Sequence, residues 1–280
     1  MSLDSGIVTY VLTPILVFIG MLLFWFIQSV VLLFVARKFI FPSLYKYKLT
    51  EWFVVEFAIA IHELSHFFAA LFTGSEINLK ESFLTSKGGR IAARSSHSIG
   101  GWISIVIAAF APAFIPSLVL FILSIILFQV NVPIYKLLEA KPNISLESYI
   151  SILSSIVLPL VNLLLSLIIS PSLFSVIFIY FMIISSLTSA PSEDDWKASY
   201  SVLFSFPVIP LLIVFILLNF VSTQFNFNLL LFILTILSIV FLFILFGILF
   251  NLMFVILIKL LERLWSLISA QIRKSLKIYD

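Results

Sequence analysis

Residues 52–72 read WFVVEFAIAIHELSHFFAALF, an apolar stretch with an HExxH pattern at its centre. His62 and His66 are four positions apart, so on a helix they lie one above the other on a single face. Two imidazoles so placed can bind one zinc ion, and Glu63 comes close enough to the open metal position to take a proton from a bound water. Chance core histidines are the alternative. Because ionisable groups are costly at membrane depth, the pattern predicts a zinc site.

The composition of the chain predicts a membrane protein. Of 280 residues, 62% are hydrophobic and 31 are phenylalanine, and the mean hydropathy is +1.24. A globule of this size cannot hide so much apolar surface from water. The chain has no cysteine, so any metal must be bound by His, Asp or Glu. The net charge of +3 is small and the basic residues lie at the ends of apolar segments, which argues against nucleic-acid binding.

The apolar segments predict an all-α polytopic membrane protein, with about six to seven transmembrane helices in one domain over residues 1–280. The expected spans are 7–35, 51–72, 100–130, 148–169, 172–190, 192–221 and 228–258. Residues 259–280 place apolar side chains at helical spacing among Lys and Arg. This tail is therefore expected to be an amphipathic helix on the membrane surface.

A second motif, Pro-Ser-x-x-Asp, stands at residues 191–195. Together with HELSH inside an apolar helix, it resembles the site-2-protease class of intramembrane zinc metalloproteases. In a branch of that class this motif supplies the third zinc ligand in place of the more familiar Asp-Gly, which the chain lacks. The resemblance implies a Zn2+ cofactor bound by His62, His66 and Asp195.

The residues by themselves leave the third ligand open among His97, Glu193, Asp194 and Asp195. Pro191 and Ser192 mark a sharp helix start, which fixes where the acids of that turn point. The residue that the resemblance selects from this group is Asp195. Its alternative role is that of a first-turn acid in a capping box, which needs no metal.

Two polar residues inside the predicted spans are further candidates. Members of the family often have an asparagine near the site that could hold the developing oxyanion, which makes Asn162 a candidate; a helix-helix hydrogen bond is its alternative role. Glu56 lies seven positions before Glu63 and shares its face. It either supports the site or a water path, or it merely reaches an aqueous edge.

The polar stretch 73–98 follows the HExxH helix and contains a segment that could form a short strand: Arg90, Ile91, Ala92, Ala93 and Arg94. In the resembled family a strand or hairpin follows that helix and lies against the site. A peptide bond inside a substrate helix is shielded, so an exposed strand edge could pair with a substrate that has been drawn out. An ordinary extramembrane loop is the alternative.

Seven spans place the connectors alternately on two sides of the membrane. Most of the Lys and Arg residues then lie on the side opposite the N-terminus. By the positive-inside rule the N-terminus is expected outside and the C-terminus in the cytosol.

These features predict an intramembrane zinc endopeptidase that hydrolyses peptide bonds of membrane-spanning or membrane-adjacent substrates, by a zinc-activated water with Glu63 as general base. The expected partners are the bilayer and a membrane protein or peptide substrate. The alternative is a non-enzymatic metal-binding membrane protein, either a zinc transporter or an inactive relative of the protease. Glu63 discriminates between the two, because a transporter needs ligands but no base beside them.

Overall fold

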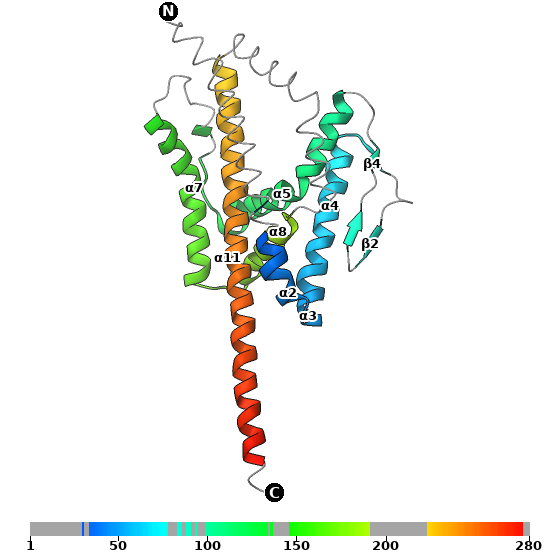
Figure 1. The fold of residues 1–280 in the computed structure, drawn as a ribbon. Coiled ribbons are helices and arrows are strands. Elements are labelled where there is room, and N and C mark those ends of the chain that lie inside the picture. The colour runs from blue at the N-terminus through cyan, green and yellow to red at the C-terminus, as the bar shows by residue number, and fades with distance from the viewer. Residues whose placement is uncertain are drawn as a thin grey trace, which may run out of the picture.

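The computed structural model describes residues 30, 34–77, 83–85, 88–90, 93–94, 99–133, 135–136, 146–190 and 223–276. Helices dominate this part of the chain (Figure 1). The longer ones are α4 (Phe57–Phe72), α5 (Ile99–Phe128), α7 (Leu146–Ile169), α8 (Leu173–Thr188) and α11 (Thr223–Leu276). Before α4 come four short helices, the π-helix η1 (Ala36–Ile40), α2 (Phe41–Leu44), α3 (Lys48–Thr50) and the π-helix η2 (Glu51–Glu56).

Four helical stretches of the described chain are long and apolar enough to cross a membrane: Lys48–Phe72, Phe110–Phe128, Ser151–Ile169 and Thr235–Ile272. They overlap the predicted spans 51–72, 100–130, 148–169 and 228–258, and the last one continues past residue 258 to Ile272. The segment 172–190 is the shorter apolar helix α8. The predicted span 192–221 and most of 7–35 lie outside the described residues, so the total of six to seven spans stays a prediction.

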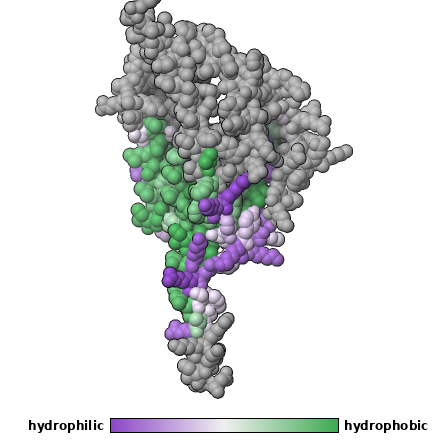
Figure 2. Space-filling view, viewed as in Figure 1, coloured by the Kyte–Doolittle hydropathy of each residue, from purple (hydrophilic) through white to green (hydrophobic). Residues whose placement is uncertain are grey.

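The outside of the helix bundle is apolar as well as its inside. Figure 2 shows hydrophobic residues over much of the coloured surface, with hydrophilic residues gathered toward its lower part. Large side chains that are exposed on these helices include Ile122, Ile126, Leu158, Ile168 and Leu249. Such a surface would promote aggregation in water but suits contact with lipid chains. The described helices therefore fit a multi-pass membrane protein.

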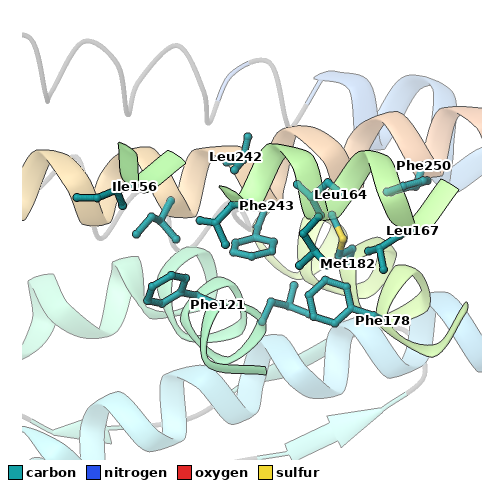
Figure 3. Packing of buried hydrophobic residues seen from close by; sticks show 13 residues of the cluster. Phe121, Ile156, Leu164, Leu167, Phe178, Met182, Leu242, Phe243 and Phe250 are labelled. Carbon is teal, nitrogen blue, oxygen red and sulfur yellow. The ribbon is translucent and has the colours of Figure 1, made fainter. Parts of the chain in front are cut away.

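The short helix α8 lies in the middle of the bundle, where it packs against α4, α5, α7 and α11. Phe178 of α8 is almost wholly buried, with its ring centroid 5.2 Å from that of Phe128 and 6.3 Å from that of Phe243. Figure 3 shows Phe178 and Met182 among side chains from α5, α7 and α11. Because lipid is as apolar as these side chains, close packing rather than the hydrophobic effect favours this arrangement.

The short helices before α4 anchor its N-terminal end. Leu44 of α2 and Val55 of η2 are fully buried in a cluster with residues of α8 and α11. At its edge, Nζ of Lys46 lies 2.8 Å from Oε1 of Glu262 on α11, and the Tyr47 hydroxyl donates to the same carboxylate. The hydrogen bond to Glu262 raises the pKa of the Lys46 ammonium. These contacts fix where α4 starts relative to α11.

Helix α11 runs without interruption to Leu276 and extends well beyond the other helices (Figure 1). The sequence predicts a separate amphipathic helix over 259–280, but the structure continues α11 through the described part of that tail. The reason is local, because residues 248–276 contain neither proline nor glycine and are rich in good helix formers. A place for the tail on the membrane surface stays a prediction.

Short strands follow α4. In the described part of residues 73–98 they form two antiparallel pairs: β1 (Glu76–Ile77) with β4 (Ala93–Arg94), and β2 (Phe83–Thr85) with β3 (Gly88–Arg90). The predicted strand 90–94 covers the end of β3 and all of β4, while Ile91 and Ala92 lie outside the described residues. Both β1 and β3 contact α4, so this segment lies beside the HExxH helix. Pairing with a substrate stays a prediction.

Gly247 marks a close approach between α8 and α11. A Cβ at this position would lie 2.4 Å from the Met182 carbonyl oxygen and 2.7 Å from Ser186 Cβ. One turn further on, Nδ2 of Asn251 donates to Ser186 Oγ at 2.8 Å and to the Ile183 carbonyl at 3.0 Å. A small residue and a buried amide thus hold the two helices together, as expected where the hydrophobic effect is absent.

We expect Gly247→Ala to destabilise the fold. Alanine gains about 1 kcal/mol of helix propensity, but the added methyl group meets a backbone atom of α8 and overpacks the interface by about 1–3 kcal/mol. The thermal midpoint of the detergent-solubilised protein should therefore fall. Leu249→Ala, at an exposed position of the same helix, is the control and should change it little. A Gly247→Ala variant as stable as the parent would contradict the close approach.

Candidate metal centre

The two histidines of HELSH face each other across one turn of α4. Nε2 of His62 and Nε2 of His66 are 3.1 Å apart, and the ring centroids are 4.8 Å apart. His62 is 8% exposed and His66 is partly buried. The structure thus brings together the two histidines that the sequence assigns to zinc.

His62 is oriented by the end of α8. Its Nδ1 lies 2.7 Å from the carbonyl oxygen of Thr188. A carbonyl can only accept, so Nδ1 carries a hydrogen, and in the neutral ring Nε2 presents a lone pair. Thr188 is the last residue of α8, where helix carbonyls have no intrahelical donor. The hydroxyl of Thr188 also donates to the Ala58 carbonyl at 3.1 Å, which ties the end of α8 to α4.

His66 is oriented from another helix in the same way. Its Nδ1 lies 2.9 Å from the carbonyl oxygen of Ala108 on α5, so this ring also carries its hydrogen on Nδ1. Histidines that bind metals usually donate the other ring N–H to a carbonyl or carboxylate, which fixes the tautomer and raises ligand basicity. Both rings of the pair therefore have the orientation of metal ligands.

The pair fits one shared cation. Two lone pairs that face each other at 3.1 Å repel unless a proton or a metal ion lies between them. Zinc–imidazole bonds are about 2.0–2.1 Å long, so one zinc ion can reach both nitrogen atoms at this separation. Neutral imidazole nitrogen is also a ligand that zinc prefers.

The predicted general base, Glu63, is partly buried and follows His62 directly in α4. On a helix its side chain leaves the axis about 100° round from that of His62, so it stands beside the ligand face rather than on it. This position is the one that a base needs, next to the metal but not among its ligands. The role of Glu63 stays a prediction.

The predicted third ligand lies outside the described residues. Among the residues that the structure describes, no group of three or more His, Asp or Glu side chains could hold a metal ion. Asp195, Glu193, Asp194 and His97 are outside the described residues. Asp195 follows Thr188 by seven positions, and a chain of that length spans at most about 25 Å.

Comparisons with known proteins found no relative of this chain. No protein-family model matches the chain. No curated protein and no solved structure matches it either.

The two remaining candidate residues, Glu56 and Asn162, lie on different helices. Glu56 is the last residue of η2, and its side chain is partly buried. Because η2 continues directly into α4, Glu56 and Glu63 belong to one continuous helical stretch. Asn162 is on α7, which packs against α8 and α11, and its side chain is exposed. The roles that the sequence suggests for these two residues stay predictions.

The sequence does not identify the groups that orient the histidines. Both are backbone carbonyls, of Thr188 and Ala108, and every residue type carries one. One signal was available, because Pro112 in the predicted span 100–130 leaves a helix carbonyl without its usual donor. The sequence could not say which donor would replace it.

Proposed function

We propose that this chain is an intramembrane zinc endopeptidase. The observation that carries the proposal is the histidine pair of HELSH, whose Nε2 atoms face each other at 3.1 Å while both Nδ1 atoms donate to carbonyls of other helices. With both Nδ1 atoms donating, the two Nε2 atoms need a shared cation between them, and a metal ion is one that fits. The pair also sits in a helix apolar enough to cross a membrane, where polar groups are expensive unless they serve a function.

In this proposal His62, His66 and Asp195 hold the metal. Zinc, when bound, lowers the pKa of a coordinated water and polarises a carbonyl group. Glu63 takes the proton from the attacking water and later gives it to the leaving amine. The carbonyls of Thr188 and Ala108 keep both imidazoles in the tautomer that can bind metal.

The substrate class follows from the surroundings of the site. Because α4 is a candidate membrane span, the scissile bond belongs to a membrane-spanning or membrane-adjacent segment. Such a segment must be unwound before attack, and an unwound peptide needs partners for its backbone. The strand pairs beside α4 support a role for the 90–94 segment as an edge that pairs with it. The proposed orientation keeps the N-terminus outside and the C-terminus in the cytosol.

Zinc content and cleavage by the purified full-length protein test the proposal. We expect about one zinc per chain. A zinc chelator should stop cleavage of co-reconstituted single-span membrane proteins, and added Zn2+ should restore it. His62→Ala should lose both properties.

Ser65→Ala is the matched control within the motif. The Ser65 hydroxyl donates to the Ile61 carbonyl of its own helix at 2.7 Å, so this variant should keep zinc and activity. A parent protein without zinc would refute the proposal. Zinc binding without cleavage of any substrate would favour the non-enzymatic metal-binding protein instead.

A further inference from the structure

Helix α5 contains two prolines one turn apart, Pro112 and Pro116, and Figure 1 shows the helix bent. In an α-helix the N–H of each residue donates to the carbonyl four residues earlier. Proline has no N–H, so Pro112 cannot donate a hydrogen bond to the carbonyl of Ala108, and Pro116 cannot donate one to the carbonyl of Pro112. Each proline therefore releases one acceptor from the helix.

Both released carbonyls accept hydrogen bonds from outside α5. Nδ1 of His66, on α4, donates to the Ala108 carbonyl at 2.9 Å. The hydroxyl of Ser189, at the end of α8, lies 3.4 Å from the Pro112 carbonyl, although its closer acceptor is the Ser185 carbonyl at 2.7 Å. At membrane depth such carbonyls need donors from the protein, because no lipid group can supply them.

We infer that Pro112 is a positioning residue for the metal centre, which orients His66 by keeping the Ala108 carbonyl out of the helix ladder. The inference rests on the proposed zinc site. An N–H at position 112 would donate to the Ala108 carbonyl and compete with His66 for it. With that acceptor occupied, the His66 ring could rotate or carry its hydrogen on Nε2, and a protonated Nε2 cannot bind metal.

The second histidine supports this reading independently. His62 also donates to a carbonyl that lacks a helical donor, here because Thr188 ends α8. One ring thus uses the carbonyl at a helix end, and the other uses a carbonyl that a proline releases. Prolines that only bent α5 would not need to place the released carbonyl against a histidine.

The test compares Pro112→Ala with Pro116→Ala in the full-length protein. The first measurement is the dissociation constant for Zn2+ by competition with a chelator. The second is nitrogen NMR of the imidazole rings in metal-free protein at about pH 8, where ordinary imidazole is neutral, which reports the tautomer of His66. Pro112→Ala should weaken zinc binding by about 10–100-fold and shift His66 from the Nδ1–H toward the Nε2–H tautomer. Pro116→Ala should change neither.

A third variant separates the hydrogen bond from the shape of the helix. Lactic acid placed at position 112 by nonsense suppression has the side chain of alanine but an ester oxygen in place of the N–H. It should restore both the zinc affinity and the His66 tautomer, whereas a merely structural role for the proline ring would leave the two replacements alike. Equal loss in Pro116→Ala, or parental values in Pro112→Ala, would overturn the inference. A parent that binds no zinc would refute the proposed function. A shift of the His66 tautomer in Pro112→Ala would then show that Pro112 orients this ring, but not for a metal ion.

Discussion

Glu63→Gln is expected to abolish peptide cleavage while leaving zinc bound. Glutamine keeps the size of the side chain and one acceptor oxygen, but its amide group cannot take the proton. A positioned general base contributes about 10²–10⁴-fold to a rate, so turnover of a reconstituted substrate should fall by that factor. Zinc should stay bound because the proposed ligands are the histidines on the neighbouring face, not Glu63. Metal analysis and a cleavage assay on the same preparation measure both properties.

Glu56→Gln is the matched control for this variant. Glu56 is a carboxylate of the same helical stretch, seven positions earlier, and the same isosteric change should leave zinc bound and cost far less activity. An equal loss in both variants would place Glu56 in the path of the proton or the water. Parental turnover in Glu63→Gln, against a substrate that the parent cleaves, would show that the peptidase mechanism is wrong.

The helices were predictable because a bilayer leaves the chain few choices. Backbone groups in lipid must be paired within a segment, so a long apolar run becomes a helix whatever its other residues are. The runs around residues 51–72, 100–130, 148–169 and 228–258 accordingly appear as helices. The end of α11 was less predictable. The charged residues that begin at Lys259 mark a change of environment, but Lys, Glu and Arg are good helix formers and do not end a helix.

The part of the candidate site that the sequence predicts is the part that depends on helical spacing alone. A separation of four places His62 and His66 on one face whatever surrounds them, and the structure has them facing. The acceptors that orient them are set by tertiary packing. At both Thr188 and Ala108 the acceptor is the backbone carbonyl, so the identity of the side chain does not predict that the residue orients a histidine. The sequence does predict one part of this arrangement, because Pro112 has no N–H to donate to the Ala108 carbonyl.

Asp195→Ala should lose zinc about as severely as His62→Ala. Catalytic zinc takes three protein ligands and keeps a further position for water, and the structure supplies two imidazoles. A ligand binds the metal directly, so its loss should weaken zinc binding by more than the roughly 100-fold that loss of an orienting partner can cost. The dissociation constant for Zn2+, measured by chelator competition on folded protein, checks this.

The neighbouring acids make this prediction specific. Asp195 follows the carbonyl that holds His62 by only seven residues, and Glu193 and Asp194 are as near to it along the chain. Glu193→Ala, Asp194→Ala and His97→Ala should keep zinc if the Pro-Ser-x-x-Asp motif selects the ligand. The competing role of Asp195 is in a capping box, whose loss would cost helix stability rather than metal. A lower thermal midpoint with full zinc content in Asp195→Ala would therefore assign the residue to the cap, whereas metal loss with an unchanged apo-protein midpoint would assign it to the zinc.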